Sequence, residues 1–159
     1  MGWVRAVHSL ISGWAIAGGL LLLAVVCVNV FSVLGSAVLS KPFPGDFELT
    51  EVGVCVAVFC FLPYCQLTGS NVSADLFTTG ASSRALSVFA FFGSLTALLF
   101  SSLLFWRMYA GMLDQKKYDY TTAILQFPHW MAFVPILISL FLLALASFMT
   151  LTNRGIRSS

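Results

Sequence analysis

The residues that could carry chemistry in this chain are few and widely spaced. The 159 residues include six carboxylates, two histidines and four cysteines. Cys55, Cys60 and Cys65 are five residues apart, so on a helix successive side chains turn by about 140° and do not share a face. Together with Cys27 they lie in apolar runs. We therefore interpret all four as small buried hydrophobic residues rather than as a metal site or a disulfide.

The other reactive groups do not form a catalytic pattern either. His8 and His129 fall at the expected ends of helices, whereas a haem would need ligands that face each other inside the bundle. A membrane disulfide oxidoreductase would need a cysteine pair at a helix end or in a loop. A small proton-coupled antiporter would need an ionisable residue deep in a span. Because the sequence offers none of these, and no Ser/His/Asp or phosphate-binding pattern, we predict no enzyme activity and no cofactor.

Long apolar runs make up most of the chain and must position these few groups. Residues 6–40, 52–74, 85–106 and 120–153 contain no Asp, Glu, Lys or Arg. Mean hydropathy is +0.95 and charged residues amount to 9%, against roughly 25% in soluble domains. About 20 apolar residues suffice to cross a bilayer, and each run is long enough.

The sequence thus predicts an all-α integral membrane protein with four transmembrane helices in an up-down arrangement. The helices are expected at about 10–39, 47–68, 85–113 and 127–151 within a single membrane domain, 1–159. Four spans place both termini on the same side. The chain leaves no room for a soluble catalytic domain, and its net charge of +2 lacks the basic cluster that a nucleic-acid partner would require. Membrane lipid is the expected surrounding.

Several local features refine the second helix. Asp46 is the expected N-cap, and Glu48 and Glu51 fall in the first turns, where carboxylates stabilise the positive end of the helix dipole. These acids could alternatively form a docking surface for an external partner. Pro63 lies inside the helix and is expected to kink it, which frees the carbonyl of Phe59.

Small residues at a spacing of four mark possible helix contacts. Ala15 and Gly19 would allow a neighbour to approach the first helix closely. Gly93, Ala97 and Ser101 form a similar stripe on the third helix, which we interpret as a contact within this protein or with another subunit. Chance in a span rich in small residues is the alternative.

Two charges are expected near the same membrane surface. Glu51 lies close to the start of the second helix and Arg107 close to the end of the third, so an antiparallel arrangement predicts an ion pair inside the bundle. Snorkelling of Arg107 to the interface is the alternative. Basic residues do not orient the chain, because four lie on each side of the predicted membrane.

Two stretches go beyond general hydrophobicity. The first is FPGDFELTE at 43–51, which runs into an apolar helix that ends with QLTGSNVSADL at 66–76. The second is ILQFPHW at 124–130. Their order resembles the small, DctQ-like membrane subunit of tripartite ATP-independent periplasmic (TRAP) transporters. In that family an acidic segment opens the second helix, an H-V-x-V-D-like signature follows it, and an I-P-x-W-like turn opens the fourth. Asp75 falls on the acidic position of that signature, while Asn71 and Ser73 depart from it.

The resemblance implies a specific function and set of partners. Such systems take up organic acids across the bacterial inner membrane. A periplasmic binding protein delivers the substrate, and a large membrane subunit carries it, coupled to a sodium gradient. The small subunit would brace the fixed scaffold of the large one, to which Glu51 or Arg107 could also form a salt bridge. The resemblance places both termini and the connection around Asp75 in the cytoplasm.

Two other readings of the sequence stay open. The chain could be the membrane anchor of a redox or signalling complex, in which case it would purify with a bound cofactor. It could also be a small transporter that assembles with itself, in which case the purified chain alone would move a substrate.

Overall fold

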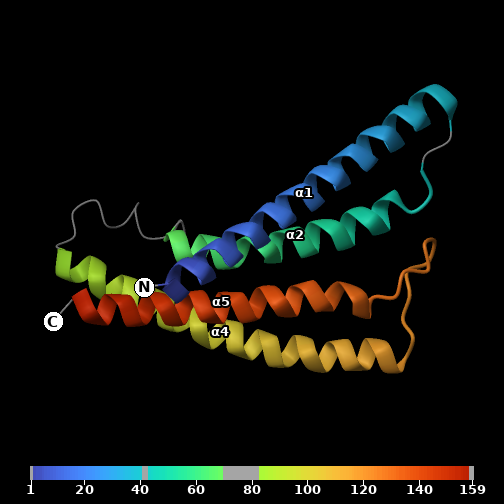
Figure 1. Ribbon diagram of the computed structural model, residues 1–159. Coiled ribbons are helices and arrows are strands. Elements are labelled where there is room, and N and C mark those ends of the chain that lie inside the picture. Colours follow the sequence, from blue (N-terminus) through green and yellow to red (C-terminus); the bar gives the residue numbers. More distant parts are fainter. Residues whose placement is uncertain (1, 41–42, 70–82, 158–159) are drawn as a thin grey trace.

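The computed structural model describes residues 2–40, 43–69 and 83–157, and these are predominantly helical. The helices are α1 (Gly2–Leu39), α2 (Asp46–Thr68), α4 (Ser83–Lys117) and α5 (Trp130–Arg157). Each contains a stretch long and apolar enough to cross a membrane. The helices alternate in direction, so that the start of α1 and the end of α5 lie at the same end of the bundle (Figure 1). The predicted four-helix, up-down fold is therefore confirmed.

The predicted helix ends differ from the observed ones mainly around the third connection. α4 continues to Lys117 instead of ending near residue 113, because the polar residues after Leu113 favour helix and its last two lysines complement the negative helix end. α5 begins at Trp130 instead of residue 127. α1 and α5 also extend beyond the predicted outer ends, to Gly2 and Arg157.

A short hairpin-like loop delays the start of α5. Thr121 and Pro128 form an isolated antiparallel bridge, and the N–H of Thr122 donates to the carbonyl of Phe127 at 3.0 Å. Gln126 adopts a left-handed backbone with φ of 51°. Pro128 therefore lies in this loop and not in the first turn of the helix.

The beginning of α2 corrects the predicted N-cap. Gly45 occupies the cap position with a left-handed φ of 85°, and no side chain caps the helix. Asp46 is the first helical residue. Its carboxylate accepts a hydrogen bond from the N–H of Phe47 and another from the hydroxyl of Ser32 on α1. Asp46 therefore ties the start of α2 to α1.

The bundle is built around two central helices. α2 packs against α1 and α5, and α5 packs against α2 and α4, so α1 and α4 are the outer helices. Val56 and Cys60 from α2 meet Ile136 and Leu140 from α5 in one buried cluster. A second cluster joins Ile11 of α1 to Leu142 and Ala146 of α5.

Glycines bring α1 and α2 into close contact. A Cβ at Gly18 would lie 2.5 Å from Cβ of Cys60, and a Cβ at Gly53 would clash with the side chain of Val25. The predicted contact residue Ala15 is buried, but Gly19 has Phe61 no closer than 4.0 Å. The close approach of the two helices is therefore at Gly18, one residue before the predicted contact residue Gly19.

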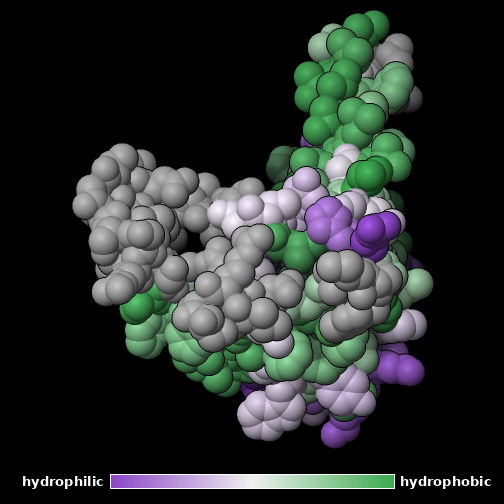
Figure 2. Space-filling model, turned by 60° about the vertical axis from the view of Figure 1, so that its left-hand side comes forward, coloured by the Kyte–Doolittle hydropathy of each residue, from purple (hydrophilic) through white to green (hydrophobic). Residues whose placement is uncertain are grey.

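The outer half of the α1–α2 pair diverges from α4 and α5, and the surface of this projecting part is largely hydrophobic (Figures 1 and 2). Phe31 and Val38 of α1 are 74% and 77% exposed. Such surfaces suit a lipid or protein neighbour rather than water. Cys60 is buried as predicted, whereas Cys27 and Cys55 are exposed on the helix surfaces, and all four cysteines are free.

Candidate interaction site at the α1–α2 and α4–α5 loops

One carboxylate on α2 holds the backbone of the α4–α5 loop. The two carboxylate oxygens of Glu48 accept the N–H groups of Ile124 at 2.8 Å and of Leu125 at 2.9 Å. A charged acceptor forms stronger hydrogen bonds than a neutral one. Because the two amides are consecutive, the pair of bonds fixes the orientation of the loop as well as its position.

The loop is further shaped by its own side chains and by Gly45. The Thr122 hydroxyl accepts the N–H of Phe127 at 2.9 Å. A Cβ at Gly45 would lie 2.6 Å from Cγ of Leu125, so a glycine is needed there both for the positive φ and for the space. The loop consequently packs directly over the beginning of α2.

A second polar group joins α1 to the segment that enters α2. The N–H of Phe43 donates to the Ser32 hydroxyl at 3.2 Å, and that hydroxyl donates to Asp46. Ser32 is 3% exposed. These bonds hold the last turns of α1 beside the chain that returns into the bundle.

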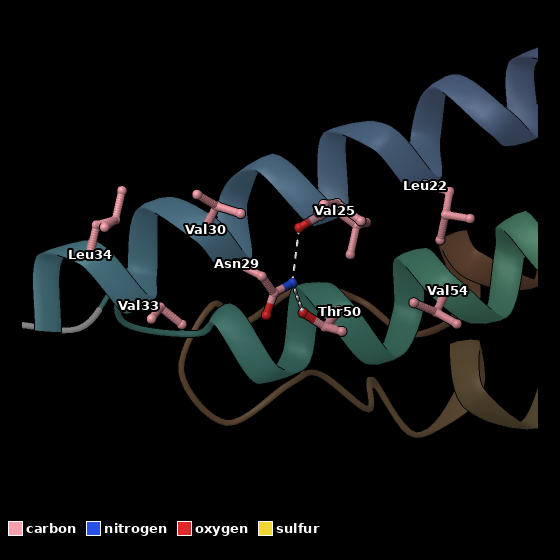
Figure 3. Close-up of a pocket in the computed structure, with 9 residues that line it drawn as sticks. Leu22, Val25, Asn29, Val30, Val33, Leu34, Thr50 and Val54 are labelled. Carbon is pink, nitrogen blue, oxygen red and sulfur yellow. Dashed lines mark hydrogen bonds between the residues drawn. The ribbon is translucent and has the colours of Figure 1, made fainter. Parts of the chain in front are cut away.

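Deeper along the same pair of helices, Asn29 of α1 faces Thr50 of α2 (Figure 3). The Asn29 amide nitrogen donates to the carbonyl of Val25 at 2.9 Å and to the hydroxyl of Thr50 at 2.7 Å. Thr50 in turn donates to the carbonyl of Asp46 at 2.7 Å. This polar group lines an otherwise apolar groove of about 400 Å³, made of Leu22, Val25, Val26, Asn29, Val30, Val33, Leu34, Thr50 and Val54.

A larger cavity lies on the other side of α2, toward α5. Its volume is about 660 Å³, and α1, α2, α5 and the α4–α5 loop contribute to its lining. The lining is apolar apart from a few groups that include Glu48, Thr122 and Gln126. Because Glu48 already accepts two backbone amides, this cavity offers little polar recognition and suits apolar atoms.

The predicted site residues do not gather in one place. Glu48 belongs to the loop contact, whereas Glu51 is exposed on α2 and Arg107 is exposed on α4. No ion pair joins Glu51 to Arg107, because α5 lies between their helices. The expected intramolecular pair is therefore wrong. Asp75 lies outside the described residues.

The small-residue stripe on α4 is divided between two environments. Ser101 is completely buried, and Ala97 is half-buried. Gly93 is exposed, and a Cβ there would meet nothing within 4 Å. Ser101 therefore already serves packing inside the subunit, while the surface at Gly93 is open to a neighbour.

A group of polar side chains also joins three of the described helices at a distance from the loops. Ser94 of α4 receives hydrogen bonds from Gln66 of α2 at 3.5 Å and from Thr150 of α5 at 3.3 Å. Within residues 2–40, 43–69 and 83–157, no three His, Cys, Asp or Glu side chains approach closely enough to hold a metal ion. The polar groups of this part of the chain are thus suited to joining helices.

Sequence reasoning identified Glu48 but not its role, and it missed Asn29, Ser32 and Thr50. The contact of Glu48 with Ile124 and Leu125 spans more than 70 residues of sequence, which no local pattern reveals. Asn29 carried a usable signal, because it is an amide within a charge-free apolar run. Polar residues in such spans usually face protein rather than lipid.

The comparisons with known proteins give one family. The model of the family described as "Tripartite ATP-independent periplasmic transporters, DctQ component" matches residues 22–154. The match covers all of α2 and α4, most of α5 and about the second half of α1, including the Glu48 loop contact and the groove around Asn29. No curated protein sequence matches the chain.

Proposed function

This chain belongs to the DctQ component family of tripartite ATP-independent periplasmic transporters, which makes it a small, multi-pass membrane subunit of such a transporter, and we propose that its role is to brace the large membrane subunit. In this role it moves no substrate itself. It holds the stationary part of the large subunit while that subunit carries an organic acid, coupled to a sodium gradient.

The family match is the observation that carries this proposal, and the arrangement of the helices supports the bracing role. α1 packs mainly on α2 and α4 packs mainly on α5, and both present long apolar faces outward. Among the described residues the acidic groups lie toward the loop ends of the helices, not at their centres. A coupling-ion site in a transporter usually lies near the bilayer midplane.

We also propose where the protein is located and which side of it faces the binding protein. We place the protein in the bacterial inner membrane, with both termini in the cytoplasm. The loop held by Glu48 and the acids at the start of α2 then face the periplasm, where the binding protein delivers its substrate. Exposed Glu51 is available for a contact there, with either the binding protein or the large subunit.

Reconstitution tests the proposal directly. The chain is co-expressed with its large membrane subunit, and the complex is placed in liposomes under an inward sodium gradient with the matching binding protein and a labelled organic acid. Uptake is then compared for the whole system, for the system without this chain, and for this chain alone.

We expect uptake with all three components, and at most residual uptake when any one is missing. Transport by this chain alone would contradict the bracing role. Full transport by the large subunit and binding protein without this chain would contradict it as well. Loss of uptake on collapsing the sodium gradient would support sodium coupling.

A further inference from the structure

We infer that the groove around Asn29 is the seat of a transmembrane helix of the large subunit, and that this helix donates a side-chain hydrogen bond to the Asn29 amide oxygen. This inference rests on the proposed function, because it presumes a large membrane subunit. It adds the place of contact and the chemistry of the group that must enter it.

The orientation of the Asn29 amide follows from its neighbours. Its nitrogen has two protons and two acceptors, the Val25 carbonyl at 2.9 Å and the Thr50 hydroxyl at 2.7 Å. The Thr50 hydroxyl donates its single proton to the carbonyl of Asp46, so it can only accept a hydrogen bond from Asn29. The amide cannot therefore be turned over, and its oxygen points away from both partners (Figure 3).

The Asn29 oxygen is left without a donor among the residues that the structure describes. It lies in a groove whose other members are apolar except for Thr50. Asn29 belongs to a membrane-spanning stretch that extends from Arg5 to Val38. Its partner Thr50 directly precedes the exposed Glu51, so this acceptor lies toward the loop end of the span, where leaving it unpaired in an apolar groove is still costly. A neighbour that supplies a donor there would remove that cost.

Two other occupants fit the amide less well. A phospholipid tail fills an apolar groove but has no donor for the oxygen. A second copy of this chain, related by a twofold axis that passes through the groove, would bring two Asn29 residues together. Both protons of each amide are already used inside its own subunit, so neither Asn29 could donate to the other.

A helix with a polar side chain meets every requirement of the groove. Val33 and Val30 are 67% and 50% exposed, which leaves them available for apolar packing. Ser, Thr, Gln, Tyr or Trp on the incoming helix would supply the donor. Hydrogen bonds of this kind contribute, together with packing, to the association of helices in membranes. The large subunit is the transmembrane partner that the family provides.

Photo-crosslinking tests the occupant without disturbing the fold greatly. A photoreactive phenylalanine analogue replaces Val33 in the groove or Leu20 outside it, in the chain co-expressed with its large subunit. Leu20 is nine residues from Asn29, which is about two and a half turns, so it lies on the opposite face of the same helix. It is 63% exposed. The adducts are identified by mass.

We expect the Val33 position to crosslink to the large subunit and the Leu20 position to give at least tenfold less of that adduct. A Val33 adduct with a second copy of this chain, or with lipid, would overturn the inference. If the large subunit fails to purify with the unsubstituted chain, the proposed function fails instead, so the two failures can be told apart.

Substitutions then test the hydrogen bond. Asn29→Leu removes the acceptor, and Val33→Trp fills the groove. Each should lower the amount of large subunit recovered on a tagged small subunit at least fivefold, whereas Leu20→Trp should not lower it. Recovery at the wild-type level with both groove variants would overturn the inference. Melting temperatures of the isolated variants show whether a loss reflects docking or misfolding. If Asn29→Leu alone misfolds, the crosslink and Val33→Trp decide.

Discussion

The indole nitrogen of Trp14 donates a hydrogen bond to the hydroxyl of Ser139 at 2.9 Å and so connects α1 with α5. The two residues are 125 positions apart. The Ser139 hydroxyl also donates to the carbonyl of Pro135 at 2.8 Å, which keeps its proton away from the indole. α1 packs mainly on α2, and this bond supplies a direct polar link to α5.

The Trp14–Ser139 bond should contribute measurably to stability. Trp14→Phe removes the donor and retains most of the ring, so we expect a loss of about 0.6 kcal/mol, and at most about 1.7 kcal/mol, in the free energy of unfolding. Unfolding in mixed micelles by a denaturing detergent measures this change. The double variant with Ser139→Ala should lose less than the sum of the two single changes. Strict additivity would mean that the bond contributes nothing.

Glu48 should control the exchange of two particular backbone amides. Glu48→Gln replaces one accepting oxygen by a donor that faces an N–H group, so the α4–α5 loop should loosen. We expect the amides of Ile124 and Leu125 to exchange hydrogen at least several-fold faster, as read by mass spectrometry of the protein in detergent.

Glu51 provides the matched control for that experiment. It lies on the same helix and carries the same charge, but it is exposed and makes no hydrogen bond to the loop. Glu51→Gln should therefore leave loop exchange unchanged. Equal acceleration in both variants would assign the effect to lost helix-dipole stabilisation, the role first predicted for both acids.

The close approach of α1 and α2 should make Gly18 intolerant of a methyl group. A Cβ there would lie 2.5 Å from Cβ of Cys60 and 3.3 Å from the carbonyl oxygen of Ala57. Gly18→Ala should lower stability by roughly 1–3 kcal/mol, the usual cost of overpacking. Gly19→Ala is the control, because its nearest neighbour lies at 4.0 Å. A Gly18→Ala protein as stable as Gly19→Ala would show that the helices separate without cost.

The sequence predicted the helices well and the contacts between them poorly, for a physical reason. Hydrophobicity over about 20 residues fixes a membrane span whatever its neighbours are. Which faces meet depends on contacts between distant segments, such as Glu48 with Leu125 or Trp14 with Ser139. The predicted Glu51–Arg107 pair assumed that consecutive helices pack together, whereas α5 inserts between α2 and α4. The N-cap was predicted at Asp46 because side-chain caps are common. In the structure Gly45 occupies the N-cap position with a left-handed backbone and no side-chain hydrogen bond.

The exposed end of the α4 stripe should matter for assembly and not for folding. Gly93 has open space where a side chain would begin, so Gly93→Leu should leave the melting temperature of the isolated subunit unchanged. If a partner helix packs closely there, the leucine should reduce recovery of the large subunit several-fold. Ala97→Leu should reduce it as well, with some loss of subunit stability because Ala97 is half-buried. Unchanged recovery for Gly93→Leu would mean that this surface faces lipid.

Removing the buried hydroxyl of Ser147, by contrast, should not lower the stability of the protein. It is completely buried on α5, and its hydroxyl has no hydrogen-bond partner among the described residues. A buried hydroxyl without a partner costs free energy, and alanine has nearly the same shape. Ser147→Ala should therefore be as stable as the wild type or up to about 1 kcal/mol more stable. Ser139→Ala, which removes a paired hydroxyl from the same helix, should be less stable. If Ser147→Ala unfolds more easily than Ser139→Ala, the Ser147 hydroxyl must bind a partner, such as a buried water molecule, that joins α5 to its neighbours.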